Sequence, residues 1–108
     1  IVQGEDKRTT ILIKNIPKII KKREIRSMVG KYGNINFLVI EPDPNSIYFN
    51  IAYLNVINYK SIIAIYMGLR KHTFNYFNKD ILIKIYYSNI QGKEELKKIF
   101  KVENYGYK

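Results

Sequence analysis

The side chains of this chain favour stacking and charge attraction over acid–base or metal chemistry. It has one histidine, His72, and no cysteine, so thiolate metal sites and disulfides are excluded. No glycine-rich phosphate loop is present, and the acids Glu41 and Asp43 lie in a proline-rich turn. By contrast, it has 10 Tyr, 5 Phe and a net charge of +10. We predict a non-enzymatic protein without cofactor or metal, whose partners are polyanions, with nucleic acid foremost.

The first element that would position such side chains is a strand over residues 9–16. Thr9 to Ile16 is β-branched and alternating, and Pro17 ends the stretch because proline cannot continue a paired ladder. We expect Ile11 and Ile13 to face the core, which leaves Leu12 and Lys14 on the opposite face.

Further apolar periodicities predict a single α+β domain. The expected elements are a helix over about 22–32 ended by Gly33, strands over 35–41 and 46–54, a helix from Asn58 to about Lys71, a strand over 81–88 and a last helix over about 93–101. This β-α-β-β-α-β order predicts a ferredoxin-like split βαβ sandwich, with both helices on one face of an antiparallel sheet and an added C-terminal helix. We expect a flexible lead-in over 1–8, the domain over 9–88 and an extension over 89–108.

The phases of the two middle strands decide which side chains the sheet would offer to a ligand. In 35–41 we expect an irregularity after Ile35, with Leu38 and Ile40 in the core and Phe37 and Val39 on the other face. In 46–54 the alternation is interpreted as Ile47, Phe49, Ile51 and Tyr53 facing inward and Tyr48, Asn50 and Ala52 facing outward.

Three blocks of sequence carry a family resemblance. They are Lys7–Pro17 (KRTTILIKNIP), Asn50–Tyr53 (NIAY) and Ile90–Lys93 (IQGK), with an aromatic spacer at Phe74–Asn78. Together they resemble the C-terminal RNA-recognition motif of Mei-two-like (meiosis-regulator-like) proteins over about residues 4–101. The resemblance implies a eukaryotic RNA-binding domain. The absence of cysteine fits an intracellular protein, which we expect to be nuclear or cytoplasmic. Aligned on Ser46–Tyr53, the RNP octamer of that motif departs from its pattern, because an aromatic is expected at Asn50.

We therefore predict that the face of the sheet away from the helices binds single-stranded or structured RNA. Unpaired bases need flat apolar rings, and the backbone needs cations beside them. The predicted RNA-binding residues are Leu12, Lys14, Phe37, Val39, Tyr48, Asn50, Lys84 and Tyr86. The predicted phosphate contacts are Lys18, Lys21, Lys22, Arg23 and Lys93.

Two alternatives remain open from the sequence. The last helix could fold across the sheet and occlude Tyr48 with Leu96 or Phe100. The domain could also be a protein-binding module with little RNA affinity, in which an acidic partner docks on the basic first helix. The apolar runs are too short for a membrane span, so we expect no membrane partner and a monomeric domain.

Overall fold

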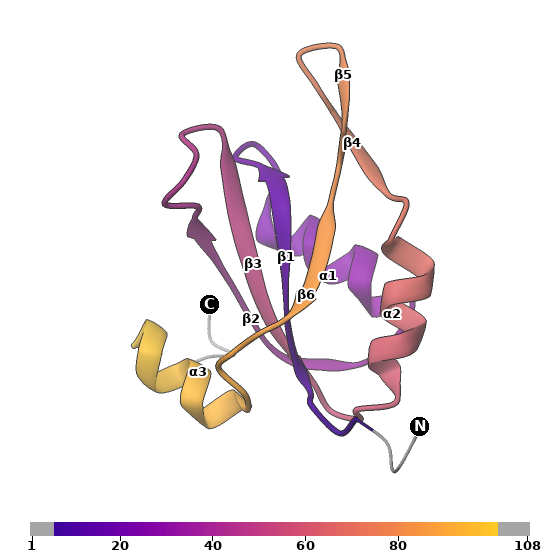
Figure 1. Cartoon of the computed structure of the whole chain (residues 1–108), viewed down its shortest axis with the longest axis vertical. Coiled ribbons are helices and arrows are strands. Elements are labelled where there is room, and N and C mark those ends of the chain that lie inside the picture. Colours follow the sequence, from indigo (N-terminus) through magenta and orange to yellow (C-terminus); the bar gives the residue numbers. More distant parts are fainter. Residues whose placement is uncertain (1–5, 102–108) are drawn as a thin grey trace.

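The computed structural model describes residues 6–101 and shows one antiparallel sheet backed by two helices (Figure 1). The elements are β1 (Thr10–Pro17), α1 (Lys22–Gly30), β2 (Ile35–Pro42), β3 (Phe49–Val56), α2 (Ser61–Leu69), β4 (Thr73–Tyr76), β5 (Lys79–Leu82), β6 (Lys84–Tyr87) and α3 (Lys93–Phe100). The four-stranded sheet has the order β2-β3-β1-β6, and β4 and β5 form a separate hairpin. This architecture confirms the predicted split βαβ sandwich with a C-terminal helix.

The main core lies between the sheet and the two helices. Ile11 and Ile13 of β1 are buried there, as predicted, against Ile25 of α1 and Ile65 of α2. Burial of each such side chain contributes about 1.5–3 kcal/mol, so this side of the sheet fixes the fold. The opposite side, which we call the open face, is turned toward the viewer in Figure 1, with α1 behind the strands.

A β-bulge in β1 explains why both ends of this strand are buried on the same side. The register with β3 shifts between Ile13 and Ile16, and Asn15 adopts φ 69°. The extra residue brings Ile16 back to the core side, where it is fully buried. The irregularity predicted after Ile35 in β2 is also confirmed, since the β2–β3 register shifts between Ile35 and Phe37.

The predicted phase of the third strand is wrong. Ala52 and Leu54 belong to the core, so alternation puts Tyr53 on the open face. Residues 46–48 are loop, and Ile47 is 77% exposed instead of buried. β3 begins only at Phe49. Because side chains alternate along a strand, a phase that is wrong by one residue assigns every side chain to the wrong face.

The helix boundaries also differ from the prediction. α1 ends at Gly30, before Gly33, and α2 begins at Ser61 instead of next to Asn58. The Asn58 side chain accepts a hydrogen bond from the backbone N–H of Lys60, so it closes the turn before the helix.

The predicted strand over 81–88 is divided between two sheets. Its first two residues, Ile81 and Leu82, end β5, which begins at Lys79 and pairs with β4, a strand that forms from a stretch predicted to be irregular. Most of the remainder is β6, which pairs with β1. The turn of the hairpin is at Phe77 and Asn78, which both have positive φ, and not at 78–80 as predicted.

Candidate nucleic-acid interface

A row of four side chains crosses the open face, one from each strand of the sheet. Val39 lies opposite Tyr53, Tyr53 opposite Leu12, and Leu12 opposite Tyr86. Their sequence neighbours Leu38, Leu54 and Ile13 are buried in the core, so alternation turns the row away from it. The structure thus brings together three of the predicted residues and adds Tyr53, which the sequence analysis placed in the core.

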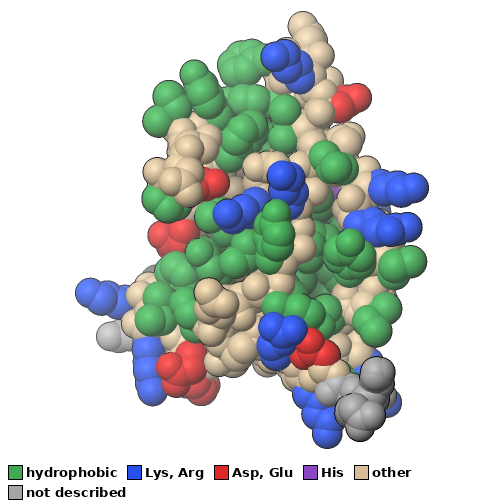
Figure 2. All heavy atoms as spheres, viewed as in Figure 1, with side chains coloured by type: hydrophobic (Ala, Val, Ile, Leu, Met, Phe, Trp, Pro, Cys, Tyr) green, Lys and Arg blue, Asp and Glu red, His purple; other side chains and the backbone are tan. Residues whose placement is uncertain are grey.

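Two lysines lie beside the exposed end of this row. Lys14 of β1 is paired with Lys84 of β6, one step along the same face. The Lys14 Nζ lies 5.8 Å from the centroid of the Tyr86 ring, within the range of a cation–π interaction. Tyr86 is 47% exposed. Figure 2 shows the same mixture, with hydrophobic side chains over the strands and Lys or Arg side chains between them.

The other end of the row is covered by α3. The ring centroids of Tyr53 and Phe100 are 4.8 Å apart, and α3 lies against β2. Burial raises the pKa of the Tyr53 phenol, and the negative charges of Asp43 and Glu41 raise it further. This half of the open face is therefore covered and has two carboxylates near Tyr53, whereas the half formed by β1 and β6 is exposed and carries Lys14 and Lys84.

The prediction that Phe37 binds RNA is wrong, because Phe37 lies in the covered part of the sheet. Its side chain is on the predicted side of β2, but it is fully buried outside the core between sheet and helices. Leu96 of α3 is fully buried as well and is also absent from that core. Phe37 therefore packs within the fold and is not available for stacking. α3 does occlude part of the sheet, through Phe100 on Tyr53 and not on Tyr48.

Two other predicted residues lie off the open face. Tyr48 is in the loop before β3, where its carbonyl accepts a hydrogen bond from the backbone N–H of Lys18. Asn50 alternates with Tyr53 onto the helix side, and its Oδ1 accepts a hydrogen bond of 3.0 Å from Lys18 Nζ. A frame one residue later, Ile47–Leu54, places Phe49 at the first aromatic position of the RNP octamer, but the predicted frame places Tyr48 there equally well, so the motif alone did not select the phase.

The predicted phosphate contacts do not form one cluster. Lys18, Lys21, Lys22 and Arg23 lie in the β1–α1 loop and the start of α1, at the end of the sheet where β1 finishes. Burial lowers the pKa of Lys22, and the charge of Arg26 lowers it further. Lys93 begins α3, which follows the C-terminal end of the antiparallel strand β6 and so lies toward the opposite end of the sheet.

The KRTT and IQGK blocks, which carry the family resemblance, are joined by a network of hydrogen bonds that holds the start of α3. Gln91 Oε1 accepts hydrogen bonds from the backbone N–H groups of Thr9 and Thr10, both at 3.0 Å. Its Nε2 donates to the carbonyls of Thr10 at 2.9 Å and Ser88 at 2.7 Å. The backbone N–H of Gly92, at φ 98°, donates to Thr10 Oγ1, which itself donates to Asn55 Oδ1. We call these contacts the Gln91 clamp; they assign a structural role to the KRTT and IQGK blocks.

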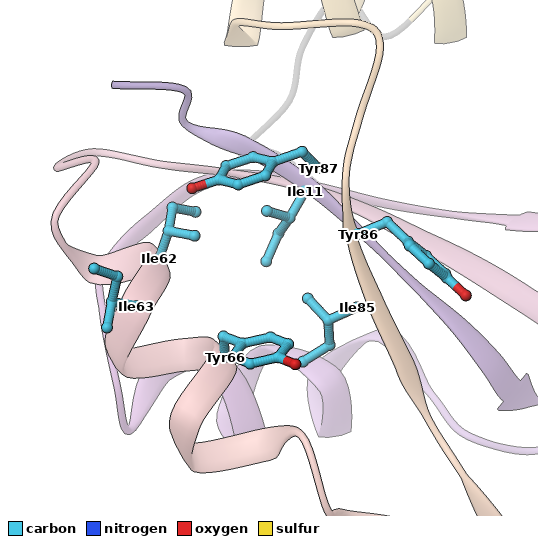
Figure 3. Close-up of a pocket in the computed structure, with 7 residues that line it drawn as sticks. All are labelled: Ile11, Ile62, Ile63, Tyr66, Ile85, Tyr86 and Tyr87. Atoms are coloured by element: carbon cyan, nitrogen blue, oxygen red, sulfur yellow. The ribbon is translucent and has the colours of Figure 1, made fainter. Parts of the chain in front are cut away.

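A separate apolar cavity lies beside the sheet, between α2 and the edge strand β6 (Figure 3). It measures ≈ 300 Å³ and is lined by Ile11, Ile62, Ile63, Tyr66, Ile85, Tyr86 and Tyr87. Arg70 and Lys84 border an adjoining hollow. Tyr86 thus stands between the open face and the cavity.

Neither a metal-binding cluster nor a membrane-spanning helix occurs among the described residues. No group of three or more acidic or histidine side chains is arranged to hold a metal ion within residues 6–101. In the same range, no helix is both long and apolar enough to cross a membrane.

The sheet, the two helices behind it and the row of rings and lysines define the chain as an RNA-recognition-motif domain. The sequence pattern of the RNA recognition motif 2 family matches residues 8–101. The chain belongs to that family, which confirms the resemblance to Mei-two-like proteins.

Curated relatives and solved structures agree with this assignment. Over 99 residues the chain is 33% identical to "Meiosis protein mei2" of Schizosaccharomyces pombe and 32% identical to "Protein MEI2-like 5" of Arabidopsis thaliana, covering 89% of this chain in both cases. The match spans only 13% and 12% of those relatives. Among solved structures, Pes4 RRM3 has a TM-score of 0.60 at 16% identity, covering 79% of this chain and 96% of that one. The Rna15 RRM with bound RNA (GU) has a TM-score of 0.61 at 14% identity, covering 87% and 97%.

Proposed function

We propose that this domain binds single-stranded RNA on the open half of its sheet, centred on Leu12 and Tyr86. The observation that carries the proposal is the exposed Tyr86 ring with Lys14 beside it and Lys84 in the adjacent pair. Single-stranded RNA is recognised by such rings, which stack on bases, and by cations, which meet the phosphates. Solved relatives of the fold are described as bound to RNA, among them the Rna15 RRM and the MEC-8 C-terminal RRM domain.

The charges of the sheet suggest the course of the RNA. Glu41 and Asp43 add negative charge near Tyr53, where a phosphate would be repelled. Lys14 and Lys84 offer positive charge at the opposite edge. A base on Tyr86 would gain about 1–3 kcal/mol from stacking, and Leu12 would give a second base an apolar contact. Together with a few phosphate contacts, these interactions predict a modest affinity for RNA. We expect the RNA strand to run along β1 and β6.

The proposal is tested by a residue-resolved NMR titration with a pool of single-stranded RNA heptamers of random sequence. Tyr86→Ala is compared with Tyr66→Ala, which removes an equally exposed tyrosine (44% against 47%) from α2 instead of the sheet. We expect Tyr86→Ala to weaken binding roughly 5- to 150-fold and Tyr66→Ala to leave it unchanged. Equal effects of the two variants, or no saturable binding by the unaltered domain at low salt, would overturn the proposal.

The salt dependence tests the lysines separately. Each lost phosphate contact reduces the slope of log affinity against log salt by ~0.7 for single-stranded nucleic acid. We expect that reduction for Lys14→Gln and for Lys84→Gln. Arg23→Gln is the control. It removes a positive charge of the same kind at the start of α1, away from the open face. The proposal also treats the domain as an intracellular monomer.

The second candidate function, protein binding, is favoured by the cavity between α2 and β6 (Figure 3). Within residues 6–101, β6 pairs only with β1, so its outer edge can accept an added strand. Arg70 and Lys84 next to the cavity suit a peptide with acidic residues beside an apolar one. In a methyl-detected titration with acetyl-Asp-Ile-Phe-Ile-Asp-amide, shifts at Ile63 and Ile85 would support this candidate. Shifts confined to α1 would instead favour the first-helix partner predicted from the sequence.

A further inference from the structure

The β4–β5 hairpin projects beyond the end of the sheet (Figure 1). Its two-residue turn carries an exposed aromatic ring, that of Phe77. Phe77 is 79% exposed. Its ring centroid lies 4.5 Å from that of Tyr76, and the Tyr76 centroid lies 5.8 Å from that of Phe49. The three rings form a continuous series, which we call the aromatic ladder, from the first residue of β3 to the hairpin tip.

The tip residue is an unfavourable choice for the turn in which it lies. Tyr76 pairs with Lys79, so Phe77 and Asn78 form a two-residue turn, with φ of 52° and 62°. Such turns favour Asn, Asp or Gly at both central positions, because a bulky side chain at positive φ is strained. Phe77 therefore opposes the turn and also leaves a large apolar surface in water. Local strain combined with exposed apolar surface is typical of a residue kept for a ligand.

The position of the aromatic ladder suits an RNA strand that is bound to the sheet and continues beyond its end. By alternation, Phe49 lies on the same side of β3 as Tyr53, so the ladder begins at the margin of the open face. Lys79 is opposite Tyr76 in the hairpin, so a positive charge lies next to the rings. The two hairpin strands contain one acidic residue, Asp80. It is opposite Asn75, next to the Tyr76–Lys79 pair, and its carboxylate accepts a hydrogen bond from the Asn75 side chain. Rings with a lysine beside them are suited to a base and its phosphate.

We propose that the hairpin is a second RNA-binding site, in which Tyr76 and Phe77 stack on an unpaired base of a strand that continues beyond the sheet. This inference rests on the proposed function and extends it. A sheet of this class holds two or three bases, so the hairpin site is occupied only by longer RNA. The length of RNA needed for full affinity then depends on the hairpin.

The test is Phe77→Asn, which removes the ring and supplies a residue that the turn prefers. Asn78→Gly is the control, since it changes the same turn and keeps the ring. Both variants are titrated with random-sequence single-stranded RNA heptamers and with trimers, and their thermal unfolding is measured. We expect Phe77→Asn to raise the midpoint of unfolding, to weaken heptamer binding roughly 5- to 150-fold and to leave trimer binding unchanged. We expect Asn78→Gly to bind both RNAs like the unaltered domain, and the Phe77 ring protons to shift upfield with heptamers alone.

The outcomes separate this inference from the proposed function. If Phe77→Asn binds heptamers like the unaltered domain while Tyr86→Ala does not, the hairpin inference is wrong and the sheet site stands. If Phe77→Asn weakens trimers and heptamers equally, the ring acts through the sheet, and the second site is again refuted. If neither RNA binds the unaltered domain, the proposed function fails first and the hairpin site with it.

Discussion

Replacement of Gln91 by alanine is the sharpest test of how α3 is held over the sheet. The Gln91 side chain makes four hydrogen bonds to backbone groups, two to the N–H groups of Thr9 and Thr10 and two to the carbonyls of Thr10 and Ser88. Alanine removes all four, and the residue is only partly buried, so water can reach some of the groups left without a partner.

The magnitude follows from this count. A hydrogen bond within a protein contributes about 0.5–1.5 kcal/mol net, so four bonds set an upper limit of roughly 6 kcal/mol. With partial replacement by water, we expect Gln91→Ala to lower the free energy of unfolding by about 2–3 kcal/mol. In a domain of this size that corresponds to a fall in melting temperature of roughly 8–24 °C.

Urea unfolding gives the stability, and amide hydrogen exchange locates the change. We expect the amides of Thr9 and Thr10 to lose protection. Asn75→Ala is the control, because it removes an exposed 3.4 Å contact to Asp80 and should change stability by no more than about 0.5 kcal/mol. If Gln91→Ala falls within the same small range and the exchange of Thr9 and Thr10 is unaltered, the Gln91 clamp does not hold α3 and the reasoning is refuted.

Two other predictions concern Tyr53 and its surroundings. Phe100→Ala should tighten the binding of RNA heptamers roughly 2- to 12-fold, because it uncovers Tyr53 next to Leu12, so that a further base can contact Tyr53 without displacing a ring pair of about 0.5–1.5 kcal/mol. Fluorescence anisotropy checks this against Ile99→Ala, a more exposed residue of the same helix, and unchanged or weaker binding would contradict it. The second prediction is that stability falls at alkaline pH, because burial raises the pKa of Tyr53 and of Tyr87 in the folded state. Their contribution is complete below about pH 10, where unfolded phenols are still protonated, and is lost as the pH rises through the raised folded values. Urea unfolding at pH 9 and pH 11 measures it, and the Tyr53→Phe/Tyr87→Phe double variant should show a smaller loss than the unaltered domain.

The sequence predicted the fold because each element of the main sheet carries its own periodicity. Alternation in β1 identified Ile11 and Ile13 as core, and the order of strands and helices then left one topology. The third strand failed because its apolar residues alternate equally well in either phase. The register with β1 and β2 selects Ala52 and Leu54 for the core, and that choice depends on partners distant in the sequence.

The hairpin failed for a different reason. A phenylalanine at the first position of a two-residue turn contradicts the usual turn chemistry, so the sequence offered no signal for β4. The pairing of β4 with β5 outweighs the unfavourable turn. Residues 1–5 of the predicted lead-in and 102–108 of the predicted extension lie outside the described residues.

By itself, the sequence determined the class of the domain, its basic charge and the place of Leu12, Lys14, Val39, Lys84 and Tyr86 on one face of the sheet. The shared face is a local property, since alternation within a strand decides which side chains lie on the same side. Only the tertiary structure decided which part of that face is exposed. The Gln91 clamp and the contact of Phe100 with Tyr53 join residues more than 40 positions apart, and they bring α3 over one half of the sheet. Whether a side chain on the right face is free to meet a ligand depends on what the rest of the chain lays over it.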